Sequence, residues 1–594
     1  MAVLVPLLFM TGLIGRLFRE FAVTLALAIG VSAILSLTLT PMMCAWILKP
    51  EPPAEQRGAF YAWSERTFER IIAAYGRGVD WVLRHQPLTL AITIATFLLT
   101  VVLAFAIPKG FFPVQDTGLI TGITEADPGV SFARMSQLQQ QVVQVVRQDP
   151  DVSAVASFIG ADGTNPTTNS GRISITLKPR DDRHANATQI IARLQSNLSQ
   201  VSGIAVYLQA VQDLQIETRQ SRTPYQYTLE DADPGELALW APTLLKKLRS
   251  LPELKNVATD QLGNGPVTLV NIDRDTASRL GITTQAIDDT LYDAFGQRQV
   301  STIFTQLNLY RVILEVNPDL AQGPHALDRI WVRNASGGVA PLSAVVQRVE
   351  TTAPLTVNHQ GQFPSVTLSF DVAPGYSLGA AVKAIRQAKD EIGMPRGLNV
   401  GFQGTAQEFR DSLANEPILV LAALITVYIV LGVLYESYIH PITILSTLPS
   451  AGVGALLALM MCGMEFDIVA LIGIVLLIGI VKKNAIMMID FALEAEREEK
   501  LTPMESIKKA CLLRFRPIMM TSFAALLGGL PLALEGGTGS ELRKPLGVSI
   551  VGGLLISQVL TLYTTPVIYL YMERFGRWLG ARRKVHPAPE GVPG

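Results

Sequence analysis

The chain has 594 residues, of which 49% are hydrophobic and 17% are charged. Charged residues make up about 25% of ordinary soluble domains, so this composition indicates a membrane protein. The formal net charge of −1 gives no reason to expect a nucleic acid as partner, and three cysteines are too few for a disulfide framework.

Seven apolar segments are long enough to cross a hydrocarbon layer of roughly 30 Å as helices. We predict these membrane helices at residues 20–48, 88–107, 415–435, 441–462, 467–491, 517–534 and 546–571. An eighth apolar segment, residues 1–10, is too short to span and has no signal-peptide pattern. We interpret it as the end of a further helix, which predicts that the chain is the C-terminal portion of a longer protein.

Basic residues gather in alternate connections between these segments. The connections 49–87, 436–440 and 492–516 and the tail 572–594 together hold 17 lysine and arginine residues, whereas the short connections on the opposite side hold four. Because basic residues concentrate on the cytoplasmic side, the first set is predicted to be a cytoplasmic linker, two cytoplasmic loops and a cytoplasmic tail. The polar stretch 108–414 then lies outside the cytoplasm.

A repeated pattern runs through this polar stretch. Residues 108–222 alternate as strand, helix, strand, strand, helix and strand, which is the split βαβ order. Residues 223–266 and 353–414 together show the same order, and residues 267–352 form an insert between them. The predicted fold is therefore a polytopic α-helical membrane protein with an α+β extramembrane region of two ferredoxin-like subdomains and one inserted subdomain.

Two adjacent lysines, Lys482 and Lys483, precede Asn484 inside the segment 467–491. A lysine at the centre of a membrane helix costs about 2.5–3.5 kcal/mol, so it normally faces a bundle interior and pairs with a carboxylate. Adjacent helical residues point about 100° apart, so the two lysines cannot share one partner. Either lysine could instead extend to the cytoplasmic headgroups. We favour a packed polar cluster for Lys483 and the headgroups for Lys482.

A second polar group opens the next helix, where Arg514 and Arg516 precede Pro517 and Thr521 follows one turn later. Proline in the first helical turn is a normal helix start, and basic residues are common at cytoplasmic helix ends. A buried threonine commonly bonds to the backbone of its own helix. These residue types alone therefore do not separate a functional site from an ordinary helix start.

Several catalytic motifs do not occur in the sequence. There is no Gly-Lys dipeptide and hence no Walker A loop, no His-Glu-x-x-His or Cys-x-x-Cys pattern and no nucleophile elbow. Methionine and histidine are sparse and scattered in the polar stretch, which disfavours a site for soft metals. We therefore predict that the protein is not an enzyme and that it has no catalytic residues, no cofactor and no bound metal.

Six motifs carry a family resemblance: GRLFREF at 15–21, LTP at 39–41, IPKGFFPVQD at 107–116, LYES at 434–437, IGIVKKNAIMMIDFA at 478–492 and RFRPIMMTS at 514–522. In this order they resemble the resistance-nodulation-division (RND) efflux transporters of the hydrophobe/amphiphile type. The resemblance covers essentially the whole chain. It is closest to the MdtB-like branch, whose members pair with a related subunit.

The resemblance implies a twelve-helix, proton-driven antiporter that works as a homo- or heterotrimer in the inner membrane of Gram-negative bacteria. Such a pump takes up amphiphilic small molecules and passes them, with a periplasmic adaptor protein, to an outer-membrane channel of the TolC type. Residues 1–10 would end the fifth helix, and the seven predicted spans would be helices six to twelve. The extramembrane region would hold two porter subdomains (PC1-like 108–222; PC2-like 223–266 with 353–414) and a docking subdomain (267–352).

Proton-relay residues are assigned by the same resemblance. In the family an Asp-Asp pair on the fourth helix binds the proton. A lysine, an arginine and a threonine on helices ten and eleven act together with this pair in the proton relay. Lys483, Arg514 and Thr521 occupy those positions, and Asn484 completes the expected relay. None of the predicted membrane segments in this sequence contains an Asp-Asp pair.

Substrate-binding residues are expected in the first porter subdomain. The loop 160–171 matches the family's flexible switch loop but contains no phenylalanine, and Asp162, Thr164 and Asn165 give it a polar character. Tyr207, Thr121 and Ile123 fall on strands that face the substrate cleft in relatives. An aromatic residue in a strand is more often part of a core, so Tyr207 could equally be structural.

Three functions remain open at this point. The chain could be a proton-coupled exporter subunit, a mainly structural partner in a mixed trimer, or a metal exporter of the same fold. The last would need methionines or carboxylates that converge in the cleft. Besides the subunits named above, the expected partners are protons, amphiphilic molecules and membrane lipid.

Overall fold

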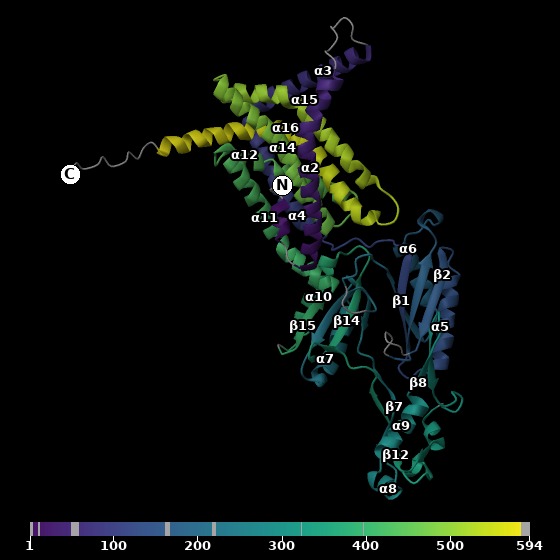
Figure 1. Cartoon of the computed structure of the whole chain (residues 1–594). Coiled ribbons are helices and arrows are strands. Elements are labelled where there is room, and N and C mark those ends of the chain that lie inside the picture. The colour runs from purple at the N-terminus through teal and green to yellow at the C-terminus, as the bar shows by residue number, and fades with distance from the viewer. Residues whose placement is uncertain are drawn as a thin grey trace, which may run out of the picture.

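The computed structural model describes residues 4–9, 12–48, 59–160, 167–216, 221–321, 323–395 and 397–583. Figure 1 shows a bundle of helices from which three smaller lobes extend at one end. One lobe contains β1 and α5, the second contains β14 and α10, and the third, with α8 and α9, lies farthest from the bundle.

The bundle consists of long apolar helices and two short ones. They are α1 (Val5–Leu8), α2 (Gly12–Ile47), α4 (Gln86–Ala106), α11 (Thr405–Tyr435), α12 (His440–Leu445), α13 (Leu448–Met461), α14 (Ile468–Glu498), α15 (Pro503–Leu534) and α16 (Ser540–Arg583). Within the described residues, seven helical segments are long and apolar enough to cross a membrane, and each overlaps one predicted range. This bundle is the membrane part of the protein.

The predicted helix start at Pro517 is wrong, because this proline lies inside α15. The helix begins at Pro503 with a capping box: the Thr502 side chain accepts from the Glu505 backbone N–H, and the Glu505 side chain accepts from the Thr502 N–H. Such a box satisfies two backbone donors that a helix start leaves unpaired. A proline farther along is tolerated, because neighbouring helices stabilise membrane helices that contain proline.

Other segment boundaries also differ from the predicted ones. The linker 49–87 contains a long helix, α3 (Ala59–Arg84), and α16 continues beyond residue 571. The segment 441–462 is interrupted between α12 and α13. Pro449 explains this interruption, because proline has no N–H for the carbonyl four residues earlier.

Small residues set the packing of α13 and α14 against α16. A Cβ atom on Gly454 would lie 2.5 Å from the Gly552 carbonyl oxygen, and one on Gly552 would overlap Ala458. At the other contact, a Cβ atom on Gly473 would overlap the Ser549 hydroxyl. Close backbone approach through small residues is how membrane helices gain packing contacts without a hydrophobic driving force.

The first lobe contains β1 (Leu119–Ala126), α5 (Phe132–Arg147), β2 (Val152–Ile159), β3 (Ser170–Leu177), α6 (Ala187–Leu198) and β4 (Ile204–Ala210). Its sheet has the order β2-β3-β1-β4 with antiparallel neighbours. Buried Ile120, Ile173 and Leu194 pack between the sheet and its two helices. Because side chains alternate across a strand, Thr121 and Ile123 lie on the opposite face.

The second lobe contains β5 (Tyr225–Glu230), α7 (Pro234–Arg249), β6 (Leu254–Thr259), β13 (His359–Gln360), β14 (Phe363–Val372), α10 (Leu378–Glu391) and β15 (Asn399–Gln403). Its strands follow the order β13-β14-β5-β15, and β6 also pairs with β14. One residue, Gly404, separates β15 from α11. The second lobe is therefore directly continuous with a membrane helix.

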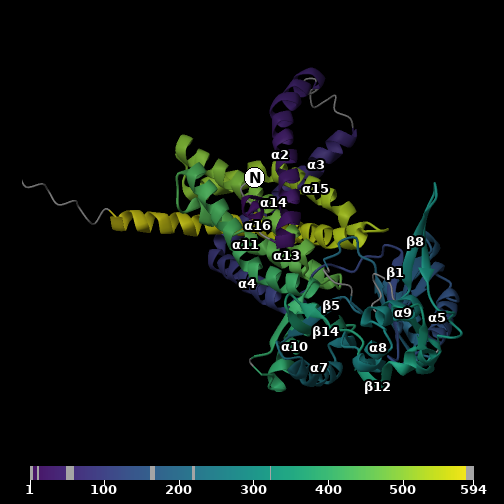
Figure 2. The same cartoon turned by 60° about the horizontal axis from the view of Figure 1, so that its bottom comes forward.

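The third lobe is inserted between β6 and β13. Strands β7 (Asn264–Ile272) and β12 (Val346–Pro354) pair as its stem. Beyond the stem lie α8 (Arg274–Arg279), α9 (Thr284–Phe295), β8 (Arg298–Phe304), β9 (Leu309–Leu314), β10 (Trp331–Arg333) and β11 (Val339–Pro341). Figure 2 shows that the β8–β9 hairpin projects away from the lobe.

Candidate functional site

Helices α14, α15 and α16 meet at a cluster of polar side chains. The Lys483 Nζ donates to the Thr521 carbonyl oxygen at 3.0 Å. The Asn484 Nδ2 donates to the Gln558 Oε1 at 2.9 Å and to the Ser522 Oγ at 3.3 Å. Asn484 is 3% exposed and Ser522 6%. The structure thus brings together three of the four expected relay residues and adds Gln558 and Ser522, which we call together the intramembrane polar cluster.

This cluster has unused acceptor capacity. The buried Asn484 Oδ1 has no hydrogen-bond partner among the described residues. Leaving such an oxygen unpaired away from water costs about 1–3 kcal/mol. The Gln558 amide is also weakly satisfied, because its Nε2 donates to the Met519 Sδ at 3.3 Å. The arrangement therefore suits a donor such as water or a protonated carboxyl group.

Arg514 lies at another level of the bundle. It lies seven positions before Thr521, which is about 10 Å along the axis of α15. Its guanidinium lies over the ring of Phe491, 4.8 Å from the centroid. Its Nε is buried and without a hydrogen-bond partner among the described residues. The structure therefore does not bring Arg514 into the polar cluster around Lys483.

One side of the polar cluster is open. Lys482 and Lys483 are half-buried, and neither makes an ion pair within the part of the chain that the structure describes. Thr521 is exposed, and its hydroxyl donates to carbonyl oxygens of its own helix at 3.0 and 3.1 Å. The Lys483 side therefore faces out of the described bundle, whereas the Asn484 side is closed.

The free face of the first sheet carries three of the predicted substrate-binding residues. Ile123 lies opposite Tyr207 on one neighbouring strand and opposite Arg172 on the other. Arg172 in turn lies opposite Phe158. Thr121 occupies the next row of the same face. Phe158 on the same face is 62% exposed. It was not among the residues predicted from the sequence, although its position in the alternating pattern of β2 could have placed it on this face.

Tyr207 is half-buried at one edge of this free face. Burial and then the nearby Glu125 carboxylate raise the pKa of its phenol, so the hydroxyl remains neutral and able to donate. Glu125 is held by Arg222, with Nε–Oε2 and Nη2–Oε1 distances of 2.7 and 2.9 Å. Asp162, Thr164 and Asn165, the other predicted contacts, lie outside the described residues.

A connector, residues 107–118, joins α4 to the first lobe and also binds the start of α14. The Phe466 N–H donates to the Pro108 carbonyl at 2.8 Å, and the Gly110 N–H donates to the Phe466 carbonyl at 3.2 Å. A third bond runs from the Ile468 N–H to the Phe111 carbonyl at 3.2 Å. The connector is therefore attached to the helix that carries Lys483.

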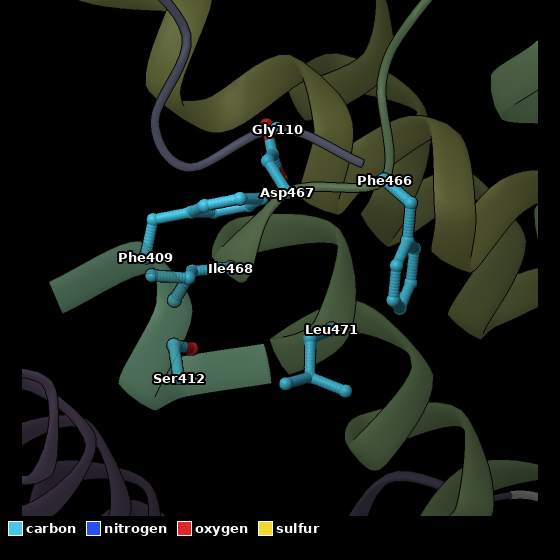
Figure 3. Close-up of a pocket in the computed structure, with 7 residues that line it drawn as sticks. All are labelled: Gly110, Phe409, Ser412, Phe466, Asp467, Ile468 and Leu471. Atoms are coloured by element: carbon cyan, nitrogen blue, oxygen red, sulfur yellow. The ribbon is translucent and has the colours of Figure 1, made fainter. Parts of the chain in front are cut away.

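Side chains around this junction close a small cavity, which Figure 3 shows. Its lining consists of Gly110, Phe409, Ser412, Phe466, Asp467, Ile468 and Leu471. The Asp467 carboxylate caps α14 by accepting from the Ala470 N–H at 2.7 Å. The ring of Phe111 packs edge-on against Phe409 of α11, and the Gly379 N–H of α10 donates to the Lys109 carbonyl at 3.2 Å. The junction thus contacts both membrane helices and the second lobe.

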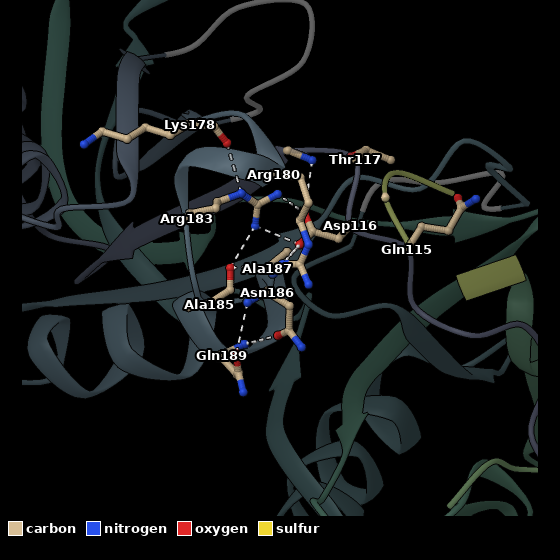
Figure 4. Close-up of polar contacts among 12 residues, drawn as sticks. Gln115, Asp116, Thr117, Lys178, Arg180, Arg183, Ala185, Asn186, Ala187 and Gln189 are labelled. Atoms are coloured by element: carbon tan, nitrogen blue, oxygen red, sulfur yellow. Dashed lines mark hydrogen bonds and ion pairs between the residues drawn. The ribbon is translucent and has the colours of Figure 1, made fainter. Parts of the chain in front are cut away.

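The other end of the connector is fixed to the first lobe by Asp116, as Figure 4 shows. Arg183 donates to both carboxylate oxygens at 2.7 and 2.5 Å, and Arg180 donates at 3.2 Å. Backbone N–H groups of Ala187 and Gly118 add bonds of 2.9 and 3.3 Å. Burial raises the pKa of Asp116, but these donors outweigh it and hold the pKa below its ordinary value.

Comparison with known proteins identifies the family. The model of the AcrB/AcrD/AcrF family matches residues 1–573, which is nearly the whole chain. The membrane-capable helices and the mixed helix-and-strand region described above fit a transporter of this type. The chain belongs to the AcrB/AcrD/AcrF family of RND transporters, and it is a multi-pass membrane protein.

Proposed function

We propose that the chain is a subunit of a multidrug efflux pump that exports amphiphilic compounds by drug/proton antiport. It would act in the Gram-negative inner membrane as one subunit of a trimer, with an identical or a related, MdtB-like partner. A periplasmic adaptor and an outer-membrane channel of the TolC type would complete a tripartite complex. The single observation that carries this proposal is the intramembrane polar cluster.

The chemistry of the cluster supports proton coupling. An ammonium group in a region of low dielectric attracts an ionised carboxylate strongly, and protonation of that carboxylate removes the attraction. Lys483 then has an alternative partner, the Thr521 carbonyl, at 3.0 Å. Asn484, on the closed side, links α14 to Ser522 and Gln558, so a change of contacts at Lys483 would be passed to the neighbouring helices. Proton binding thus exchanges one set of contacts between helices for another.

We infer that the carboxylate approaches from the open side of the cluster. Lys483 faces that side, and the described residues offer it a backbone carbonyl rather than an acidic side chain. The Asp-Asp pair that the family resemblance places on another helix has the required chemistry. The proposed relay therefore comprises Lys483, Asn484 and Thr521 at one level and Arg514 at a second level.

Movement of α14 would reach the substrate sites through the connector. Three backbone hydrogen bonds attach the connector to the start of α14, and Asp116 clamps its far end to the first lobe. We propose that substrate binds the free face of the first sheet at Thr121, Ile123, Phe158 and Tyr207. The adjoining loop residues Asp162, Thr164 and Asn165 are included in the proposed site.

The direct test compares two lysine variants of the complete protein in cells that depend on the pump. Lys483→Met removes the ammonium of the cluster, and Lys482→Met is the matched control on the neighbouring side of the same helix. We expect Lys483→Met to abolish efflux without loss of folding or trimer formation, and Lys482→Met to retain it. Normal efflux by Lys483→Met would overturn the proposal.

A further inference from the structure

Helix α3 lies at the end of the bundle remote from the three lobes, as Figure 1 shows. One face of it is packed against α15 and α16. Tyr75 is 4% exposed, stacks on Phe515 with ring centroids 4.5 Å apart and donates to the Leu562 carbonyl at 3.0 Å. Gly78 allows close contact, because its Cβ would lie 2.7 Å from the Tyr563 ring.

The opposite face is aromatic and basic. Trp63, Arg70, Arg77 and Arg84 follow one another at intervals of seven residues. Seven helical residues turn through about 700°, so these side chains form one stripe along the helix. Trp81 lies one turn from both Arg77 and Arg84 and extends the same stripe. Trp63 and Trp81 are 60% and 50% exposed, and the three arginines are also exposed.

The acidic residues of α3 lie beside this stripe rather than on it: Glu65 and Glu69 are exposed but point about 100° or more around the helix from Arg70. Asp80 of α3 pairs with Lys508 of α15, with an Nζ–Oδ1 distance of 2.5 Å. Within the described residues, Arg70, Arg77 and Arg84 make no ion pair. The stripe therefore presents concentrated positive charge that is not neutralised by the surrounding helices.

The position of α3 in the chain brings this stripe to the membrane surface. His85 alone separates α3 from the membrane-spanning α4, so Trp81 and Arg84 lie within about one and a half helical turns of a span. Tryptophan is enriched at the level of lipid headgroups. A basic helical face with exposed tryptophans is typical of helices that bind anionic membrane surfaces.

We propose that the stripe of Trp63, Arg70, Arg77, Trp81 and Arg84 binds the phosphate headgroups of anionic phospholipids. Arginine suits this ligand because its planar guanidinium bonds phosphate oxygens in pairs. Each basic residue near such a surface contributes roughly fivefold in affinity, and three contribute about a hundredfold. This site is independent of the proposed antiport.

The test measures lipid retention by the complete chain in its native assembly. Phosphatidylglycerol or phosphatidylcholine is titrated into detergent-solubilised protein, and the lipids that remain bound are counted by native mass spectrometry. The variant is Arg70→Gln with Arg77→Gln and Arg84→Gln. The matched control, Arg147→Gln with Arg311→Gln and Arg333→Gln, removes the same charge from exposed positions on the lobes.

We expect the α3 variant to lose about a hundredfold in affinity for phosphatidylglycerol, with phosphatidylcholine unchanged. The control and the corresponding arginine-to-lysine triple variant should retain phosphatidylglycerol. If the triple variant does not assemble, Arg77→Gln alone should still lose about fivefold. Unchanged retention by the α3 variants, or an equal loss of both lipids, would overturn the proposal and assign the stripe to another partner, such as an acidic protein.

Discussion

Gly110→Ala adds one methyl group where the connector crosses the start of α14. The new Cβ would overlap the Glu465 Oε2 and lie 3.1 Å from the Glu465 Cβ. Adding a methylene-sized group to a packed site costs about 1–3 kcal/mol, because neighbouring atoms must move. The exposed Glu465 carboxylate can swing aside, so the contact that displaces the connector is the 3.1 Å one with the Glu465 Cβ. Because the connector bonds to Phe466 and Ile468, we expect efflux to fall while membrane insertion and assembly persist.

A second substitution separates steric overlap from a general effect of alanine. Glu465→Gly removes both the carboxylate and the Cβ atom that the new methyl group would contact. The double variant Gly110→Ala with Glu465→Gly should therefore recover most of the efflux. The two substitutions should be non-additive by about 1 kcal/mol or more, since residues in direct contact couple by about 0.5–3 kcal/mol.

Efflux rate and thermal unfolding of the purified protein are measured together for these variants. Gly401→Ala is the control, because a Cβ on Gly401 meets no atom within 4 Å. Efflux by Gly110→Ala equal to that of the control would refute the coupling through the connector. A double variant as impaired as Gly110→Ala alone would refute the role assigned to Glu465.

Three further changes test the cluster, the clamp and the sheet face. Asn484→Leu should lower the free energy of unfolding by about 1 kcal/mol, because it leaves the half-buried Gln558 amide oxygen without its donor; an unchanged unfolding temperature would contradict that hydrogen bond. The pKa of Asp116 is lower in the folded protein than its ordinary value. Ionised Asp116 therefore stabilises the fold fully above the ordinary aspartate pKa of about 3.9, and this stabilisation is lost as the pH falls through the lowered pKa. Asp116→Asn should therefore lower the free energy of unfolding by about 3–5 kcal/mol near neutral pH. It should also make the stability of the first lobe depend less on pH, which unfolding experiments between pH 3 and 7 measure. Phe158→Ala and Tyr207→Ala should each change the relative resistance to different amphiphiles at equal protein levels, and an unchanged resistance profile would favour a mainly structural subunit.

Hydropathy and local pattern were sufficient for the coarse architecture. Every predicted span overlaps a helix that is apolar enough to cross a membrane, since length and composition alone determine that property. Helix boundaries were less predictable. The start of α15 was placed at Pro517, although the capping residues Thr502 and Glu505 were present in the sequence. A proline inside a membrane helix and a proline at its start look alike when the stabilising neighbours are unknown.

The sequence could not predict all residues of the candidate site, because the site is formed by contacts between segments that are far apart in sequence. Gln558 lies 74 residues from Asn484 in sequence, and periodicity cannot show that their helices place these amides 2.9 Å apart. Phe158 enters the sheet face through strand register, which one sequence specifies poorly before the pairing is known. Conversely, the family resemblance grouped Arg514 with Lys483, whereas the geometry of α14 and α15 places the two at different levels of the bundle.

Proton movement in response to substrate tests the central claim most directly. The complete pump is reconstituted in vesicles that enclose a pH-sensitive dye, and substrate is added to wild type, Lys483→Met and Lys482→Met at equal protein amounts. We predict that substrate drives proton flux through wild type and Lys482→Met but not through Lys483→Met. Substrate-driven flux through Lys483→Met at the wild-type rate would contradict the role of the polar cluster in coupling.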